Sequence, residues 1–271
     1  MALARADLES LLRARQLDRT LTTALPAIDP RDEYALAPSG ITALDARLGG
    51  GFPRGQLSEL VGLRSSGRTS LQLQMLAAAT ARGELVALVD ARDMLDVPSA
   101  ASAGVDLVRL LWIRGHVVSN PGMCRDLNQR ALEQAIRALT LVLQAGNFGL
   151  VVFDAADVPA DAVRRLPFTT WLRLQRMVEG SQTACVLVGS EPMARSSAGL
   201  TLRLGVAEGI RGSGLGIRRD SGLGSRDSAS GIRFHNCLFD GLSVEARVIR
   251  ARAREQEEAT AIFSTVVSDC A

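Results

Sequence analysis

Hydrophobic and polar residues follow two different patterns along this chain. Short runs that are apolar at nearly every position are typical of strands buried on both faces of a parallel sheet. Longer segments repeat their apolar residues every three or four positions, which is typical of amphipathic helices. The two patterns take turns between residues 56 and 204. Strands are predicted at 56–61, 85–90, 110–113, 150–154, 184–188 and 200–204, and helices at 69–82, 126–145 and 161–179, the last of them broken near Pro167.

Strands separated by helices need crossover connections, which are right-handed and bring parallel strands into one sheet. We therefore expect an α/β fold with a mostly parallel central sheet and helices on both faces. The chain has 271 residues, of which 47% are hydrophobic, and this is enough to fill the core of one sizeable domain. That core is expected over residues 36–205.

Both ends of the chain depart from this pattern. Leu8, Leu11 and Leu12 have helical spacing among charged residues, so residues 1–35 are predicted to hold an amphipathic helix and a linker. Residues 206–232 are rich in glycine, serine and arginine and have few apolar side chains to offset the entropy of ordering, so a disordered insert is expected there. Residues 242–249 alternate apolar and polar positions, and within 233–271 we expect one last strand and a charged tail.

Composition narrows the available chemistry. All 31 basic residues are arginine, which excludes Schiff-base chemistry and a lysine general base. Four widely separated cysteines and two histidines give no zinc-binding spacing and no thiol redox pair. Charged residues precede any apolar run at the N-terminus, and the longest uncharged stretch, between Arg137 and Asp154, is too short to span a bilayer. We expect a cytoplasmic protein with no membrane partner.

The most specific motif lies between a predicted buried strand and a predicted helix, and it reads Gly62-Leu63-Arg64-Ser65-Ser66-Gly67-Arg68-Thr69. Glycines here allow backbone N–H groups to curl around an anion, and the helix N-terminus adds partial positive charge. The hydroxyl of Thr69 can ligate Mg²⁺, and Asp154, which ends another buried strand, can supply a carboxylate on the other side of the metal.

Arg68 stands where a standard phosphate-binding loop has lysine. Arginine keeps the charge, but its planar fork is larger and differently aimed, so the replacement is not conservative beside the β- and γ-phosphates. Two interpretations follow from the residues alone. The segment is either a nucleotide site or a strand–turn–helix junction that has kept the loop geometry and lost the nucleotide.

Residues 39–204 resemble the RecA recombinases. Residues 39–69 (SGITALDARLGGGFPRGQLSELVGLRSSGRT) are similar to the segment that leads into the RecA phosphate loop, and residues 90–106 (DARDMLDVPSAASAGVD) are similar to the next RecA block without gaps. The resemblance implies ATP and Mg²⁺ as cofactors. The positions that it assigns to the nucleotide are Gly62, Ser65, Ser66, Gly67, Arg68, Thr69, Ser70 and Asp96, and those for the metal are Thr69 and Asp154.

Three departures from the family pattern fall in this one site. Arg68 replaces the phosphate lysine, Arg92 stands where RecA has the glutamate that activates the attacking water, and Ser99 stands where an aromatic ring would stack on adenine. The glutamine that senses the γ-phosphate is absent as well, and the DNA-binding loop after residue 188 is much shortened. These departures argue against efficient ATP hydrolysis and count against the use of ATP and Mg²⁺, and we assign no catalytic residue.

A degenerate RecA-like domain with short DNA-binding loops is similar to the ImuA-type proteins of bacterial SOS cassettes. This resemblance implies a non-catalytic or weakly catalytic adaptor in SOS DNA repair and translesion synthesis. Its partner would be an ImuB-like polymerase-related protein or a RecA filament. One alternative is an ATP-dependent recombinase or RadA-type ATPase that binds single-stranded DNA, and another is a cellular regulator on the same scaffold that never contacts DNA.

Arginine is locally in excess near the C-terminal end. Between residues 195 and 254 there are eleven arginines and five acidic residues, a balance that favours salt-dependent contact with a phosphate backbone. A solvated basic tail is the alternative. The candidate contacts to single-stranded DNA are Arg247, Arg250, Arg252 and Arg254.

Two further acidic residues, Asp157 and Asp161, follow the strand predicted at 150–154. We interpret both as residues that begin a helix rather than as catalytic acids.

Overall fold

The computed structural model describes residues 36–116, 125–194, 198–206, 241–251 and 260–266, and all structural statements concern these ranges. The strands are β1 (Leu36–Ala37), β2 (Phe52–Pro53), β3 (Leu57–Gly62), β4 (Val86–Asp90), β5 (Leu110–Arg114), β6 (Leu150–Asp154), β7 (Ala184–Gly189), β8 (Leu200–Val206), β9 (Gly241–Ala251) and β10 (Thr260–Val266). The helices are α2 (Thr42–Arg47), α3 (Arg68–Ala81), α4 (Val97–Ser102), α5 (Arg125–Ala145), α6 (Ala160–Arg164) and α7 (Phe168–Val178), with a 3₁₀ turn at Leu107–Arg109.

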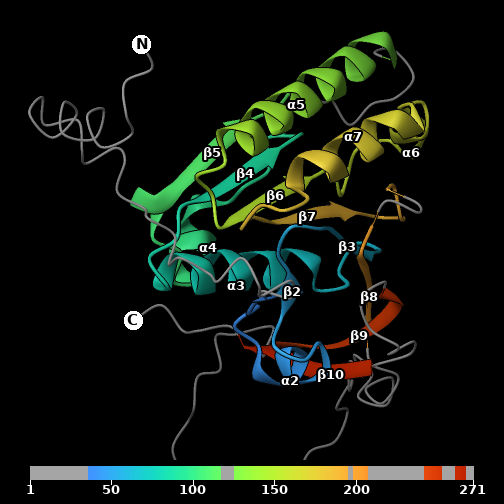
Figure 1. The fold of residues 1–271 in the computed structure, drawn as a ribbon. Helices are drawn as coiled ribbons and strands as arrows, with labels where there is room; N and C mark the ends of the chain where they lie inside the picture. Colours follow the sequence, from blue (N-terminus) through green and yellow to red (C-terminus); the bar gives the residue numbers. More distant parts are fainter. Residues whose placement is uncertain (1–35, 117–124, 195–197, 207–240, 252–259, 267–271) are drawn as a thin grey trace, which may run out of the picture.

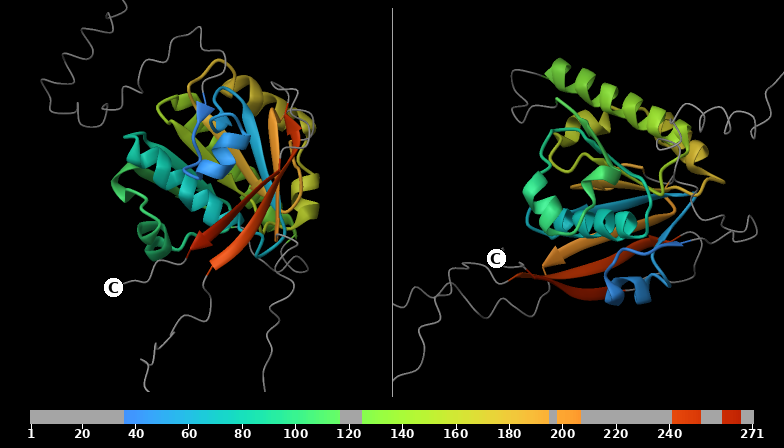
Figure 2. Two further views of the ribbon diagram at one scale, coloured as in Figure 1. Left: turned by 90° about the horizontal axis from the view of Figure 1, so that it is seen from below. Right: turned by 90° about the vertical axis from the view of Figure 1, so that its left-hand side faces the viewer.

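The central sheet has eight strands in the order β10-β9-β8-β3-β7-β6-β4-β5. The six strands from β8 to β5 are parallel to their neighbours, whereas β9 and β10 are antiparallel. Helices α3 and α4 cover one face of the parallel part, and α5, α6 and α7 cover the other (Figure 1 and Figure 2). The expected α/β architecture is confirmed.

Burial explains why the strands read as continuous apolar runs. Every residue of β3, β4 and β7 is buried, because helices pack on both faces of the sheet at these positions. The break expected near Pro167 is also present, since α6 ends at Arg164 and α7 begins directly after the proline. Proline lacks the N–H that would continue a helix.

The C-terminal part of the fold corrects one expectation. The strand predicted at 242–249 is β9, but it is not the last strand. β10 pairs with β9 in antiparallel register in the part of the chain where we expected a charged tail. Ala261 and Phe263 are buried while Ile262 between them is exposed, so this strand alternates faces with a period of two.

Several other expectations concern residues outside the described ranges. These are the N-terminal helix and linker over residues 1–35, the insert from 207 onward, and the candidate DNA contacts Arg252 and Arg254. Within the described ranges, no helix combines the length and apolarity that crossing a membrane requires.

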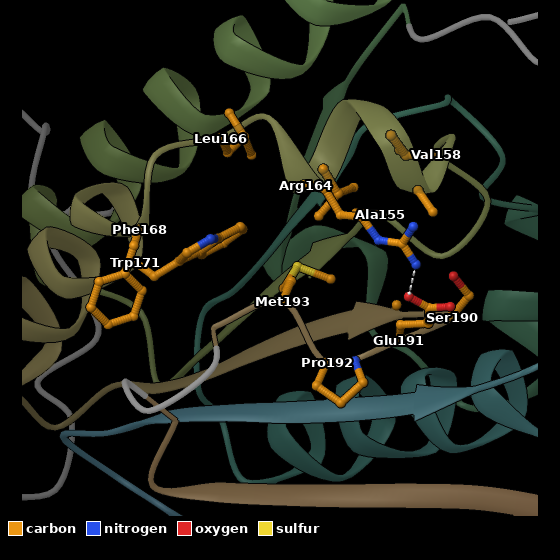
Figure 3. A pocket seen from close by; sticks show the side chains of 13 residues that line it. Ala155, Val158, Arg164, Leu166, Phe168, Trp171, Ser190, Glu191, Pro192 and Met193 are labelled. Atoms are coloured by element: carbon orange, nitrogen blue, oxygen red, sulfur yellow. Dashed lines mark hydrogen bonds and ion pairs between the residues drawn. The ribbon is translucent and has the colours of Figure 1, made fainter.

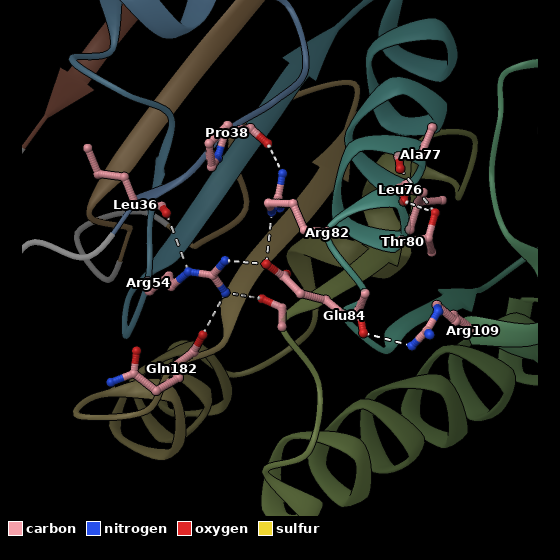
Figure 4. Close-up of polar contacts among 12 residues, drawn as sticks. Leu36, Pro38, Arg54, Leu76, Ala77, Thr80, Arg82, Glu84, Arg109 and Gln182 are labelled. Atoms are coloured by element: carbon pink, nitrogen blue, oxygen red, sulfur yellow. Dashed lines mark hydrogen bonds and ion pairs between the residues drawn. The ribbon is translucent and has the colours of Figure 1, made fainter. Parts of the chain in front are cut away.

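A buried polar cluster connects the segments that precede the parallel strands, at the amino-terminal ends of those strands (Figure 4). The Glu84 carboxylate accepts from Arg54 Nη2 at 2.7 Å and from Arg82 Nε at 2.9 Å. Arg54 Nη1 also donates to the carbonyl oxygens of Gly149 and Gln182, which precede β6 and β7. These arginine and glutamate charges are therefore paired at the amino-terminal ends of the strands, whereas the phosphate loop lies at the carboxyl ends. There they hold neighbouring strands in position.

Candidate functional site

The segment between β3 and α3 has the curled backbone of a phosphate loop. Ser65 and Gly67 have φ values of 58° and 87°, both in the left-handed region. Gly67 also lies so close to β9 that an added Cβ would be 2.5 Å from Cγ2 of Val244. Glycine is required there on both counts. Helix α3 begins at Arg68, one residue before the predicted start, so the first backbone N–H groups of the helix face the loop region.

A cavity of about 210 Å³ lies beside this loop, at the carboxyl ends of β4 and β6. This is where parallel α/β sheets commonly bind ligands. Arg68, Thr69, Asp96 and Asp154 line the cavity among the predicted residues, together with Asp90, Arg92, Ser99 and Asp157. The remaining predicted positions form the loop and the first helical turn next to it, namely Gly62, Ser65, Ser66, Gly67 and Ser70.

Asp154 is the predicted metal ligand at the end of β6. Its Oδ1 accepts from the backbone N–H of Ala156 at 2.9 Å. Burial raises the pKa of the Asp154 carboxyl, and the neighbouring Asp90 charge acts in the same direction. Asp90 is itself committed to the turn after β4, because its carboxylate accepts from the backbone N–H groups of Arg92, Met94 and Leu95.

No three His, Cys, Asp or Glu side chains are grouped to hold a metal ion in the part of the chain that the structure describes. Mg²⁺ commonly keeps most of its water and uses one or two protein carboxylates. The assignment of Thr69 and Asp154 as metal ligands therefore stays a prediction.

Asp157 corrects the sequence interpretation most clearly. Helix α6 begins at Ala160 with Pro159 as its N-cap, so Asp157 does not cap it. Its carboxylate instead faces three arginines. Arg64 Nε lies 3.0 Å from Oδ1, Arg92 Nη1 lies 3.7 Å from Oδ2, and Arg68 Nη2 lies 3.9 Å from Oδ1. We call these four residues the Asp157 cluster.

Two of the three arginines are those that depart from the RecA pattern. The side chains of Arg68 and Arg92 are only 7% and 11% exposed. Arg68 Nη1 also donates to the carbonyl of Ala156, and Arg92 Nη1 donates to the carbonyl of Asp157. Burial lowers the pKa of the Arg68 guanidinium, and the charge of Asp157 partly opposes this effect. The two replacements thus share one acidic partner.

Asp96 has a local structural role. Its carboxylate accepts hydrogen bonds from the backbone N–H of Ser99 at 3.0 Å and from the Ser99 hydroxyl. Asp96 is thereby the N-cap of α4. These hydrogen bonds lower the pKa of the Asp96 carboxyl. Ser99, where an aromatic ring would stack on adenine in the family pattern, is therefore engaged with Asp96 in the helix cap.

Sequence reasoning missed Glu59, in the middle of buried β3. One carboxylate oxygen accepts from the backbone N–H groups of Met193 and Ala194 at 2.6 Å each, and the other accepts from Thr201 Oγ1 at 2.9 Å. Glu59 thereby fastens the short β7–β8 connection to the sheet. The signal in the sequence was a single charged residue within a strand predicted to be buried, since a buried charge needs specific partners.

A second, smaller cavity of about 60 Å³ lies on the other face of the sheet, after β6 and β7 (Figure 3). The side chains of Leu166, Trp171 and Met193 line it. At its rim Arg164 Nη2 donates to Glu191 Oε2 at 2.6 Å, which joins the segment after β6 to the segment after β7. This cavity holds none of the predicted site residues.

Arg247 and Arg250, the two candidate DNA-contacting arginines within the described ranges, line neither cavity. Arg247 and Arg250 are exposed on β9. Arg203 on β8 is also exposed and lies directly opposite Arg247 in the antiparallel register. Like charges directly opposite each other are unfavourable in a sheet, so this placement brings two exposed arginines together at the junction of β8 and β9.

The arrangement around the phosphate loop does not fit ATP and Mg²⁺ in a hydrolytic complex. The cavity is lined by four aspartates and two arginines, so its own charge opposes a polyphosphate. The guanidinium groups of Arg68 and Arg92 are directed at Asp157. No carboxylate base is present at position 92.

Comparison with known proteins relates this site to one family. The RecA N-terminal domain family matches residues 26–164, slightly more than half of the chain. Protein RecA of Clavibacter michiganensis subsp. michiganensis is 40% identical over 134 residues, which cover 48% of this chain and 33% of that protein. Protein RecA of Rhodococcus jostii is 35% identical over 164 residues, which cover 54% and 43%. The matched residues thus span less than half of the length of each of these two relatives.

A solved structure agrees at the level of the fold. The crystal structure of the RadB recombinase matches with a TM-score of 0.54 and 20% identity, over 84% of this chain and 96% of that chain. Such an identity supports the fold alone. Taken with the curved glycine loop, the parallel sheet and the match over residues 26–164, the sequence relationship is decisive: the chain belongs to the RecA N-terminal domain family.

Proposed function

We propose that this chain is an ImuA-type accessory protein in SOS DNA repair and translesion synthesis, acting as a non-catalytic adaptor. The observation that carries the proposal is the Asp157 cluster. The two arginines that replace functional residues of the family are both paired within the chain. An arginine at position 92 cannot accept a proton from water, because it stays protonated at all physiological pH values.

The β7–β8 connection supports the same reading. In a DNA-binding recombinase this segment needs freedom to contact the nucleic acid. Here Glu59 holds Met193 and Ala194 against the sheet, and Arg164 pairs with Glu191 across the second cavity. A connection that is anchored to the sheet at Met193 and Ala194 suits a scaffold that presents a fixed surface to a protein partner.

The surface that we propose for docking is the β5 edge of the sheet. Among the described strands β5 pairs only with β4, so one side of its backbone is open to a further strand. Val108, in the turn before β5, is 93% exposed, and Leu107 and Leu111 beside it are also exposed. An open edge with apolar side chains is suited to a strand from the partner, for which we propose the ImuB-like polymerase-related protein.

The deciding experiment measures partner binding and ATP hydrolysis with the same full-length preparation. The adaptor function predicts co-elution with the ImuB-like protein in size-exclusion chromatography, and no ATP turnover above that of an Asp154→Ala control. A parallel experiment uses a RecA filament as the partner. Failure to associate with either partner contradicts the adaptor function, and turnover that depends on Asp154 contradicts its non-catalytic character.

The second candidate is an ATP-dependent recombinase or RadA-type ATPase that binds single-stranded DNA. Two observations favour it: Thr69 and Asp154 line the same cavity, and Arg203 and Arg247 lie opposite each other on an exposed strand pair. Calorimetry with ATP and Mg²⁺ tests the first observation, and micromolar binding lost in Asp154→Ala supports the enzyme. Binding to single-stranded DNA that weakens with salt and is reduced in Arg247→Gln tests the second.

A further inference from the structure

In the Asp157 cluster three arginines surround one carboxylate, as they would surround a bound anion. Arg64 lies within the loop, Arg68 begins α3, and Arg92 follows β4, so three separate segments point their guanidinium groups at one carboxylate. Arginine forks recognise carboxylates and phosphates with the same donor geometry. Arg64 donates a hydrogen bond to the Asp157 carboxylate, and Arg68 and Arg92 lie at ion-pair distance from it. An external phosphate at this position would meet the same three positive charges.

We propose that Asp157 is an internal ligand that masks a phosphate-type oxyanion site formed by Arg64, Arg68 and Arg92. In the native protein the carboxylate holds these arginines and excludes an external anion. Removal of the carboxylate exposes a site that binds inorganic phosphate. The Asp157 carboxylate thus competes with an external anion for the three arginines.

The main chain keeps two of the arginines in place without the Asp157 carboxylate. Arg68 Nη1 donates to the carbonyl of Ala156 at 3.3 Å, and Arg92 Nη1 donates to the carbonyl of Asp157 at 3.2 Å. Neither acceptor is lost when the side chain of residue 157 is shortened. The donors are therefore still gathered in such a variant, and a pre-organised site binds with a smaller entropy loss.

The surroundings of Asp157 decide whether an external anion can reach the three arginines. Asp157 is 31% exposed, so a phosphate reaching this point does not have to enter a closed interior. The acidic lining of the cavity explains why the native protein resists such an anion, since Asp154 and Asp90 already offset much of the arginine charge.

The test compares wild type, Asp157→Ala and Asp157→Asn by thermal unfolding in inorganic phosphate, with chloride at matched ionic strength as the reference. We expect phosphate to leave the wild-type Tm within about 1 °C of its value in chloride. Both variants unfold at a lower Tm in chloride, and phosphate raises it by about 5 °C at saturation, since binding to the native state stabilises it. Calorimetric titration with phosphate gives the matching dissociation constant.

A double variant, Asp157→Ala with Arg68→Met, controls for general effects of the substitution. The phosphate-dependent rise in Tm is lost in this protein if the site uses the guanidinium of Arg68. An equal rise in wild type and Asp157→Ala overturns the proposal, as does an absence of response in both single variants. Should the single variants be unfolded in chloride, recovery of the native circular dichroism spectrum in phosphate supports the proposal, and no recovery contradicts it.

The inference does not depend on the adaptor function. Phosphate binding by Asp157→Ala is measured without a partner, and partner binding is measured with the wild type. A protein that binds no partner can still show the unmasked anion site, and a protein without that site can still act as an adaptor. The two failures are therefore distinguishable.

Discussion

Arg68 and Arg92 occupy positions where a buried charge must either contact a ligand or find a partner within the protein. Both are directed at Asp157, which lies beyond the end of β6. Asp157 is not part of the phosphate-loop motif at residues 62–69. Both side chains make hydrogen bonds and ion pairs inside the chain. Gly67 is needed at the junction between β3 and α3 on structural grounds alone, because Val244 approaches it closely.

The buried Asp154 carboxyl makes the stability of the protein depend on pH. Its folded-state pKa is raised by burial, so the native state binds more protons than the unfolded state in the interval above the ordinary value of 3.8. Stability contributed by this group therefore falls as the pH rises above the ordinary pKa of the carboxyl. We expect Asp154→Asn to raise the free energy of unfolding at pH 7 by about 1 kcal/mol.

The measurement is urea unfolding of both proteins between pH 4 and pH 8 in the presence of a chelator. The difference between them shrinks as the pH falls, because the raised pKa favours proton uptake by the wild-type carboxyl in the folded state. A variant that is less stable than wild type at pH 7 contradicts this prediction. If added Mg²⁺ stabilises the wild type and leaves Asp154→Asn unchanged, the ATPase alternative gains support.

Among the elements, Glu59 links β3 to the β7–β8 connection. Its carboxylate is buried and accepts three hydrogen bonds from Met193, Ala194 and Thr201. Glu59→Ala leaves these donors without a partner, and we expect a loss of about 3 kcal/mol in the free energy of unfolding. Glu59→Gln keeps the shape and one carbonyl oxygen, so it is expected to lose less than half as much.

Glu191→Gln is the matched control for this prediction, because it removes a carboxylate from the same connection at an exposed ion pair with Arg164. Exposed pairs contribute little, and the expected change is below about 0.5 kcal/mol. Urea denaturation of the three variants gives the comparison. Equal losses in Glu59→Ala and Glu191→Gln would show that Glu59 does not act as the link.

The elements also show what a sequence can and cannot predict here. The strands of the parallel sheet were predictable because burial on both faces leaves almost no polar residue in them, as in β4 and β7. β10 was missed because it alternates over only seven residues after a charged segment. The Asp157 cluster was missed because its members come from three separate segments, after β3, β4 and β6, which meet only at the carboxyl ends of these strands in the folded sheet.

For the molecule as a whole, the sheet has two edges with different surroundings. At one edge β10 packs against α2 and is antiparallel to β9. At the other edge the parallel strand β5 pairs only with β4 among the described strands (Figure 1). The side chains of Leu107, Val108 and Leu111, on this strand and just before it, are exposed. Natural sheets usually cover or charge their open edges to prevent unwanted pairing. Among the described residues no strand or helix covers this apolar edge, which is why we propose it as the docking surface.

This asymmetry gives a test of the proposed docking surface that uses one substitution at each edge. Leu111 on β5 and Ile262 on β10 are both exposed, so aspartate at either position is expected to change the free energy of unfolding by less than about 0.5 kcal/mol. Leu111→Asp places a charge where the partner strand would bury an apolar contact. We expect it to weaken binding of the ImuB-like protein at least about tenfold, and Ile262→Asp to leave the affinity unchanged. Surface-immobilised binding assays on both variants measure the two affinities under one condition. A loss of affinity in Ile262→Asp alone moves the docking surface to the antiparallel edge, and equal affinities in all three proteins exclude both sheet edges as the contact.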